Sequence, residues 1–175
     1  ALIYVGDDGG RIAGCYILNP VKLLTGDVVV LGAQSVDAAV DPDYRGRGVF
    51  TELAEAALKD AAVEGVRLAF AFPTKGAFGG QVRVGYKPRF QIPKAYRPLV
   101  GLPRRRRFTD LAVSESDRFD DSFDVFSKHA NGEEVTVRRD PKYLRWRYGE
   151  HPAHTYETLI CERDGELCGY CVLRV

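Results

Sequence analysis

The sequence predicts a mixed α/β fold, and three patterns within residues 1–72 carry that prediction. Residues 1–18 have the pattern of two strands around a tight Asp-Asp-Gly-Gly turn, which is a strong hairpin signal. An amphipathic helix is expected from about Val49 to Glu64, with Gly65 as its stop. The apolar run 66–72, bounded by Gly65 and Pro73, is typical of a strand buried on both faces.

The other elements follow from the same signals. Residues 28–40 form a strand region that ends at Asp41-Pro42, residues 74–85 a short helix, and residues 86–100 a broken strand. Two helices are expected over 120–130 and 140–150, the second with Asp140 as its N-cap and Pro141 at its first position. The last stretch, 155–175, has the pattern of another hairpin that turns at Asp164-Gly165.

Two features suggest how the chain is organised. The run GLPRRRRF, residues 101–108, looks like a boundary between a first domain, 1–103, and a second segment, 108–175. The hairpin sequences GRIAGCYIL (10–18) and GELCGYCVL (165–173) share both glycines and the final leucine, which hints at a duplicated unit or at hairpin convergence. Methionine is absent even at position 1, as expected for an internal fragment or for a sequence from which modified methionines were dropped.

Composition excludes several classes of protein. A net charge of +1 gives no electrostatic reason to expect nucleic-acid or membrane binding, and no apolar run reaches membrane-spanning length, so a cytoplasmic location is expected. The run 104–107 could touch phosphates, but an isolated basic run is usually a solvated linker. Cys168 and Cys171 lie in a strand pattern whose alternation separates residues three apart, so we favour a structural role over redox or metal chemistry. No metal is expected at His151 and His154.

The stretch that points to chemistry is Arg45-Gly46-Arg47-Gly48, which stands between a strand and the start of a helix. Glycines allow backbone angles that aim successive N–H groups into one concavity, and a helix N-terminus adds unpaired donors and a positive dipole end. Two arginines reinforce the positive charge. The stretch therefore favours a site for phosphate or pyrophosphate over an exposed turn whose arginines serve solubility.

A dinucleotide-binding loop is disfavoured because Thr51 stands where its third glycine is needed, and the Gly-Lys-Ser/Thr of a P-loop is absent. The segment VDPDYRGRGVF instead resembles the Gln/Arg-x-x-Gly-x-Gly/Ala signature of the GNAT superfamily of acyl-CoA-dependent N-acyltransferases, with a tandem-GNAT protein as one form. Arg45 and Gly48 match, whereas Phe50 replaces the final small residue and must point into the core. The resemblance covers about residues 1–100 and is weak over 108–175. It implies a largely antiparallel central sheet flanked by helices, with its first strand and leading helices missing before Ala1.

Carried to this sequence, the resemblance implies an acyl-CoA cosubstrate, with acetyl-CoA expected, and an amine acceptor that is a small molecule or a peptide. The backbone of Ala38 and Val40 would pair with the pantetheine arm. The pyrophosphate would lie against the turn, whose implied binding residues are Arg45, Gly46, Arg47, Gly48, Val49, Phe50 and Thr51. The identity of the acceptor and the oligomeric state, including a homo-oligomer, are left open by the sequence.

Catalytic residues are the weakest part of the resemblance. The usual acid of the family, a tyrosine, is replaced by Gln81, and the position that sometimes holds a glutamate base is roughly Gln34. Asp37 is the nearest carboxylate on that strand and is the candidate base, although a hydrogen-bonded or solvated strand residue is the ordinary interpretation. Tyr86 is expected to pack in the core. The sequence thus leaves two functions open: an N-acyltransferase, and a non-catalytic module that binds acyl-CoA.

Overall fold

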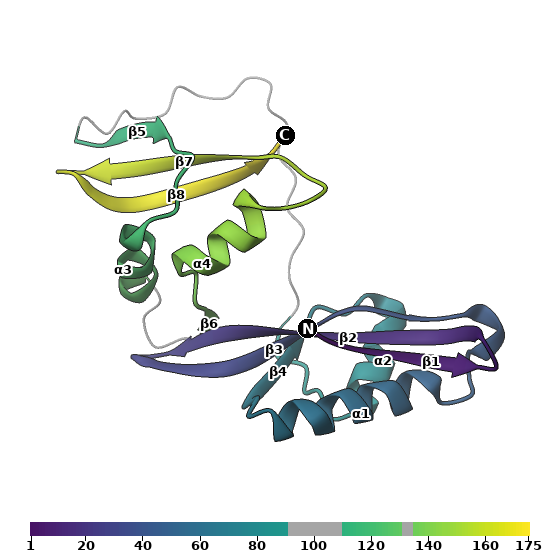
Figure 1. Cartoon of the computed structure of the whole chain (residues 1–175). Helices are drawn as coiled ribbons and strands as arrows, with labels where there is room; N and C mark the ends of the chain where they lie inside the picture. The colour runs from purple at the N-terminus through teal and green to yellow at the C-terminus, as the bar shows by residue number, and fades with distance from the viewer. Residues whose placement is uncertain (91–109, 131–134) are drawn as a thin grey trace. The chain divides into compact units, whose positions relative to one another are not determined.

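We describe a computed structural model of the 175-residue chain, over residues 1–90, 110–130 and 135–175. The contacts divide the chain into two units, Ala1–Gln91 and Ile92–Val175. Each unit has a sheet with helices packed on it, coloured from purple to teal for the first and from green to yellow for the second (Figure 1). The expected mixed α/β fold with largely antiparallel pairing is confirmed.

In the first unit, the sheet has the strand order β1-β2-β3-β4. Its elements are β1 (Leu2–Asp8), β2 (Arg11–Thr25), β3 (Val28–Val40), the 3-10 turn η1 (Pro42–Tyr44), α1 (Val49–Val63), β4 (Leu68–Ala71) and α2 (Lys75–Arg83). The first three strands pair antiparallel, whereas β4 runs parallel to β3 because the crossover passes through α1. The expected hairpin, the strand 28–40 and both helices are confirmed.

The core of the first unit lies between the sheet and α1, which runs along one face of the sheet (Figure 1). Tyr16, Leu18 and Ala33 from the strands are buried against Ala54, Ala57 and Ala61 of the helix. Alanines on this helix face let its backbone approach the sheet closely, so the packing depends on large side chains from the strands. Phe50 joins this core from the first turn of α1, as its place in the motif requires.

Two expectations for the first unit need correction. The run 66–72 was expected to be buried on both faces, but only Leu68–Ala71 is a strand and none of its residues is buried. The reason is its place at the end of the strand order, where Leu68 is 43% exposed. The broken strand expected over 86–100 is not seen in 86–90, which carries no regular structure, and its remainder lies outside the described residues.

The second unit has a sheet with the order β5-β7-β8 and helices on one face. Its elements are β5 (Ala112–Glu115), α3 (Asp121–Ala130), β6 (Val135–Val137), α4 (Pro141–Leu144), the π-helical turn η2 (Arg145–Gly149), β7 (Tyr156–Arg163) and β8 (Glu166–Arg174). The expected helices and the hairpin turn at Asp164-Gly165 are confirmed, and Asp140 caps α4 by accepting from the Tyr143 N–H at 2.9 Å. Leu144, at the end of α4, is fully buried, whereas Trp146 in η2 is 54% exposed.

Candidate functional site

The strand β3 parts from β4 at Ser35, and the candidate site begins there. The last parallel pair is Ser35 with Ala71, whereas β3 continues to Val40. Over the same stretch the β2–β3 register shifts, because Cys15 pairs with Ala39 and Ile17 with Val36. Such a bulge bends a strand and changes where its backbone groups point. Beyond Ser35, the edge of β3 that had paired with β4 can therefore bind an extended ligand in the way that it would bind another strand.

Asp37 lies in this bulge and has a left-handed backbone with φ 46°. Non-glycine residues in that region are uncommon, and aspartate is one of those that tolerate it. The Asp37 carbonyl accepts a hydrogen bond from the Cys15 thiol at 3.3 Å, while its side chain is exposed. The structure thus places the expected base on an exposed bend of β3, next to Ala38.

Directly after β3, the chain makes the turn that the motif predicts. Gly46 and Gly48 have φ of 75° and 88°, which L-residues other than glycine rarely adopt, and Gly48 is the N-cap of α1. The Glu52 N–H donates to the Gly48 carbonyl at 3.1 Å. The amides of Val49, Phe50 and Thr51 precede that bond, so helix geometry gives them no intrahelical acceptor. These donors and the helix dipole make the turn suited to an anion.

The two arginines of the motif lie against neighbouring groups of this turn. The Arg45 Nε donates to the Val40 carbonyl at 3.2 Å, and the Arg47 guanidinium lies 5.3 Å from the centre of the Tyr44 ring. On the same ring, the Arg11 guanidinium lies at 5.1 Å. Both motif arginines are exposed, so they can leave these contacts for a phosphate at the cost of weak surface interactions.

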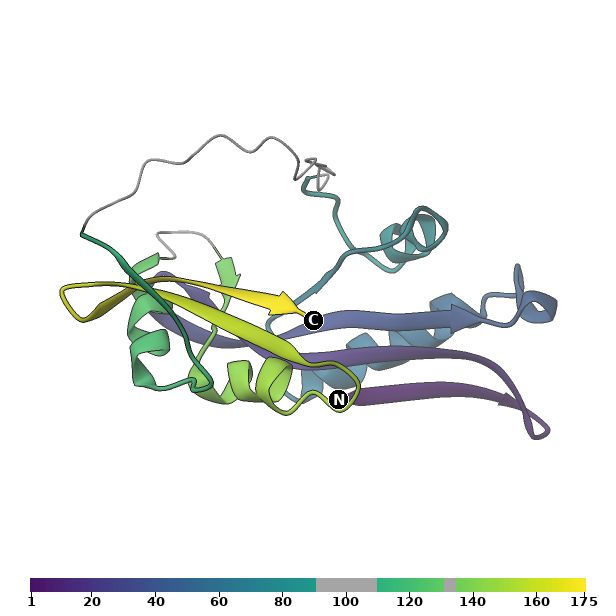
Figure 2. The same ribbon diagram turned by 90° about the horizontal axis from the view of Figure 1, so that it is seen from above.

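The β1–β2 turn is hydrogen-bonded to this region, and both lie at the same end of the sheet, which Figure 2 shows from above. The Tyr44 hydroxyl donates to Asp8 at 2.8 Å, and Arg11 bonds Asp41 at 3.2 Å and Asp43 at 2.6 Å. The Asp43 N–H and the Arg11 guanidinium lower the pKa of the Asp41 carboxyl. Arg11 therefore offsets two carboxylates that would otherwise weaken anion binding at the neighbouring turn.

A buried polar network occupies the position of the missing catalytic tyrosine. Gln81 on α2 is 4% exposed; its amide donates to the Ser35 hydroxyl at 3.0 Å and accepts from the Tyr16 hydroxyl at 3.2 Å. The Tyr16 and Tyr86 hydroxyls lie 3.3 Å apart. Burial and the Tyr16 hydroxyl raise the pKa of the Tyr86 phenol, so it stays protonated. Gln81 is thus a fully engaged structural residue at the point where β3 and β4 part.

Sequence reasoning missed part of this network. Tyr16 and Ser35 carry no motif signal, although both sit inside strands at positions where a polar group must find a partner once buried. Gly80 also carries no motif signal, but a Cβ there would lie 2.7 Å from the Phe50 ring, so the glycine lets α1 and α2 approach. Gln34, expected near the base position, pairs with Asn19 and Phe70 in mid-sheet and is half-buried.

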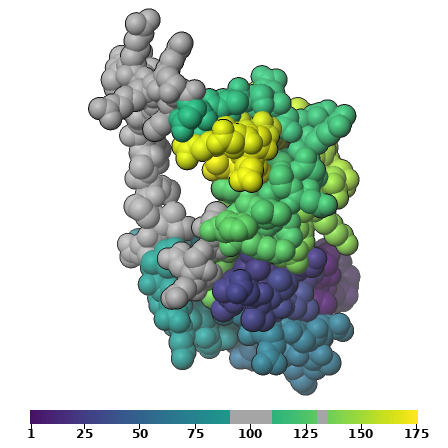
Figure 3. Space-filling view, turned by 90° about the vertical axis from the view of Figure 1, so that its left-hand side faces the viewer, coloured from purple at the N-terminus to yellow at the C-terminus, as the bar shows by residue number. Residues whose placement is uncertain are grey.

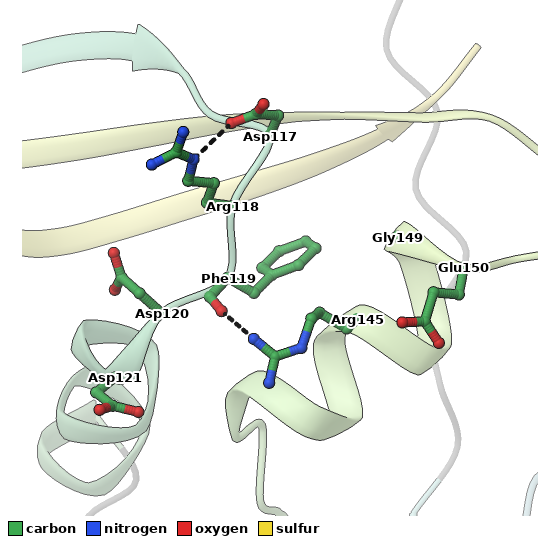
Figure 4. A pocket seen from close by; sticks show the side chains of 8 residues that line it. All are labelled: Asp117, Arg118, Phe119, Asp120, Asp121, Arg145, Gly149 and Glu150. Atoms are coloured by element: carbon green, nitrogen blue, oxygen red, sulfur yellow. Dashed lines mark hydrogen bonds and ion pairs between the residues drawn. The ribbon is translucent and has the colours of Figure 1, made fainter.

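The second unit contains a separate hollow of about 480 Å³ (Figure 4). Its lining includes Asp117, Arg118, Asp120 and Glu150, and the Arg145 guanidinium spans it to the Phe119 carbonyl at 2.9 Å. With Asp121, the lining has four carboxylates against two arginines, so its formal charge is negative and it does not favour an anionic ligand.

Three further expectations concern the basic run, membrane spans and metal binding. The run 104–107 lies outside the described residues. Within 1–90, 110–130 and 135–175, no helix is long and apolar enough to cross a membrane. No group of three or more His, Cys, Asp and Glu residues in that part of the chain is arranged to hold a metal ion. His151 and His154 stack on each other with ring centres 4.8 Å apart.

Comparison with known proteins agrees with the geometry of the first unit. The family model described as "Acetyltransferase (GNAT) domain" matches residues 2–88. No curated protein matches the sequence.

Two solved structures resemble nearly the whole chain. A conserved protein of unknown function from Enterococcus faecalis, described as a probable N-acyltransferase, has 18% identity and a TM-score of 0.72 over 99% of this chain and 44% of that one. A GCN5-related N-acetyltransferase from Anabaena variabilis has 15% identity and a TM-score of 0.68 over 98% and 44%. The chain spans less than half the length of either protein, and at these identities the likeness shows the fold.

Proposed function

Because the chain belongs to the GNAT acetyltransferase family through residues 2–88, we propose that it transfers an acyl group from acyl-CoA to a primary amine. The observation that carries the proposal is the turn at Gly46 and Gly48, which follows β3 and η1 and leads into the first turn of α1, whose amides have no intrahelical acceptor. Acetyl is the acyl group that we expect, and the acceptor is a small molecule or a peptide. A cytoplasmic setting and the oligomeric state stay predictions.

The residues at the turn fit the pyrophosphate of CoA. The amides of Gly46, Gly48, Phe50 and Thr51, next to Val49, would hold its oxygens, and Arg45 and Arg47 would add charge-assisted hydrogen bonds. The backbone of Ala38 and Val40, on the edge of β3 beyond the last pair with β4, would bond the pantetheine arm. When bound, acyl-CoA supplies the thioester that the amine attacks.

The chain's own part in the transfer is to position acyl-CoA and to prepare the amine. Asp37 would accept a proton from the ammonium form of the acceptor, directly or through one water, since its exposed carboxylate stands on the bend next to the pantetheine edge. No titratable residue replaces the tyrosine acid at Gln81. The leaving thiolate would therefore take its proton from solvent or from the nitrogen of the newly acylated amine.

A second function is favoured by one observation. Gln81 is buried and bonded on both sides, and Gln34 is held in mid-sheet, so neither usual catalytic position carries an acid or a base. A non-catalytic module that binds acyl-CoA as a sensor or scaffold would keep the turn and lose those groups. The two functions predict the same CoA affinity and differ in turnover.

The test compares two substitutions by calorimetric titration with acetyl-CoA. Gly48→Asp places a carboxylate at the turn, and we expect it to abolish CoA binding. Gly65→Asp is the matched control, because Gly65 has a nearly equal φ of 85° but lies at the other end of α1. Both variants carry the same backbone strain and charge, so a loss confined to Gly48→Asp identifies the binding site. Equal affinities of the two variants would remove the proposal.

Turnover is then measured against a panel of primary amines, with wild type beside Asp37→Asn. An N-acyltransferase should lose about 10²- to 10⁴-fold in kcat when its base is removed, with acetyl-CoA affinity unchanged. Tight CoA binding without turnover in wild type would instead support the sensor or scaffold. Equal turnover in Asp37→Asn would show that this carboxylate is not the base.

A further inference from the structure

The β7–β8 hairpin contains an irregularity, and two cysteines lie close together at it. Cys161 pairs with Gly169 and Glu162 with Leu167, so Cys168 is the extra residue of a β-bulge. The Cys161 and Cys168 sulfurs lie 3.6 Å apart, and the Cys168 Sγ is 3.2 Å from the Cys161 carbonyl. Sequence spacing had directed attention to Cys168 and Cys171, whereas the contact that the structure forms joins Cys168 to the facing strand.

The pair faces away from the core of its unit. Ile160 and Leu167, which precede the two cysteines, pack on the cluster of Phe119, Phe123 and Leu144 beneath the sheet. Strand alternation therefore turns Cys161 and Cys168 toward the opposite face. Cys168 is exposed and Cys161 is half-buried. Figure 3 shows atoms of the C-terminal hairpin, in yellow, on the surface of the molecule. Because Cys168 is exposed, a small oxidant can approach its sulfur.

The neighbours of the Cys161 thiol favour its protonated form. The hydrogen bond with Cys168 raises the pKa of the Cys161 thiol, with loss of water contact and the charge of a neighbouring thiolate acting in the same direction. The Arg163 guanidinium, which pairs with Asp110 at 3.0 Å, opposes this rise at Cys161. A raised pKa leaves less thiolate on Cys161, so the exposed sulfur of Cys168 meets the oxidant first.

We propose that Cys161 and Cys168 are a peroxide-sensitive thiol pair that closes to a disulfide across the β7–β8 bulge. One thiolate attacks an oxygen of hydrogen peroxide, the O–O bond breaks, and a sulfenic acid and water are formed after protonation. The second thiol then attacks the sulfenic sulfur, displaces hydroxide, which leaves as water, and forms the S–S bond. Two thiols are oxidised and one peroxide is reduced to two waters.

The bulge makes the closure easy. The sulfurs must approach from 3.6 Å to about 2.05 Å, which side-chain rotation can supply where the ladder is already broken. Gly169 stands beside the pair, and a Cβ there would make only ordinary contact with the Cys161 Cβ at 3.8 Å, so no side chain crowds the site. Continued regularly from the turn, where Glu162 pairs with Leu167, the ladder would have placed Cys168 directly opposite Cys161, and the bulge sets Gly169 there instead.

The test uses peptide mapping of the full chain. The folded protein is treated with a small excess of hydrogen peroxide, alkylated with N-ethylmaleimide, and cut with trypsin. Cleavage after Arg163 separates Cys161 from Cys168, so their disulfide appears as two linked peptides. We expect two of the four free cysteines to lose their reactivity, and dithiothreitol to restore them.

Variants assign the link, because the peptide after Arg163 contains both Cys168 and Cys171. Cys171→Ser should keep the linked peptides, whereas Cys168→Ser should lose them. Oxidation of the urea-unfolded chain provides the reference in which proximity along the chain favours Cys168 with Cys171. A folded protein that yields that same link, a link to Cys15, or four alkylated cysteines would overturn the proposal.

Discussion

The two hairpins β1–β2 and β7–β8 carry the same irregularity at the same place. In the first, Gly6 pairs with Gly14 and Asp7 with Ile12, so Ala13 is the extra residue. In the second, Cys168 is extra and Gly169 faces Cys161. The glycines that the two sequences share therefore have structural roles: Gly10 and Gly165 hold left-handed turns with φ of 93° and 81°, and the other two occupy the bulge.

Their environments differ, although the backbone plan is shared. The first bulge lies under the start of α1, where Ala13 is 5% exposed and a Cβ on Gly14 would lie 3.2 Å from the Val49 side chain. The second bulge is open on the face with Cys168. Because the shared residues are those that the hairpin shape requires, the likeness alone cannot separate duplication from convergence. One hairpin frame thus lies beside the Gly46–Gly48 turn, which we propose binds an anion, in one unit, and exposes a thiol pair in the other.

The largest expected difference concerns the two bulge glycines. A Cβ at Gly14 would lie 2.8 Å from the Ala39 carbonyl oxygen, whereas a Cβ at Gly169 would meet nothing closer than 3.8 Å. The backbone carbonyl of Ala39 cannot move aside as the end of a flexible side chain can. Gly14→Ala should therefore lower the free energy of unfolding by about 2–3 kcal/mol. Gly169→Ala should cost less than about 1 kcal/mol. Urea unfolding followed by far-UV circular dichroism measures both, and equal losses would contradict the difference in crowding.

The next difference concerns the residues that follow two places later, Tyr16 and Cys171. Tyr16 is fully buried and its hydroxyl bonds Gln81, while Cys171 is exposed. Tyr16→Phe leaves the Gln81 oxygen buried without that donor, and we expect a loss of about 1–2 kcal/mol in unfolding free energy. Cys171→Ala should change stability by less than about 0.5 kcal/mol. If Tyr16→Phe were neutral, the network would not contribute to stability.

Many of the hairpins and helices were predictable from sequence, and the features that were missed were missed for physical reasons. Turn glycines, helix caps and the motif at Arg45–Gly48 act locally, so hairpins, α1 and the capping Asp140 were found from pattern alone. The bulges were not, because an extra residue in a strand leaves no local signal when both neighbours are apolar or small. The network of Tyr16, Ser35 and Gln81 joins three segments far apart in sequence, so only the folded chain reveals it. For the same reason, the short strand β5 escaped detection.

The smallest expected effect is on stability in acid, where one carboxylate from each unit can be compared. In the second unit, Asp124 bonds Arg138 through two contacts of 2.8 and 2.7 Å and pairs with Lys128 at 3.1 Å. The Arg138 guanidinium is the main cause that lowers the Asp124 pKa to about 2. In the first unit, Asp41 has a lowered pKa as well, but its side chain is 30% exposed against 17% for Asp124 and its partner Arg11 is 53% exposed, so screening weakens the pair more.

A carboxyl whose pKa is lower in the folded chain than in the unfolded chain stabilises the fold above its unfolded pKa, and that contribution is lost as pH falls. For Asp124 the loss should run from about pH 4 down to about pH 2 and amount to about 1 kcal/mol after allowance for its remaining exposure. Asp124→Asn should therefore lower the free energy of unfolding of the second unit at pH 7 and flatten its acid limb, which is the fall of that free energy between about pH 4 and pH 2. The fluorescence of Trp146 can follow both. Asp41→Asn should leave that limb unchanged. An acid limb that keeps its slope in Asp124→Asn would mean that another group controls the acid unfolding of this unit.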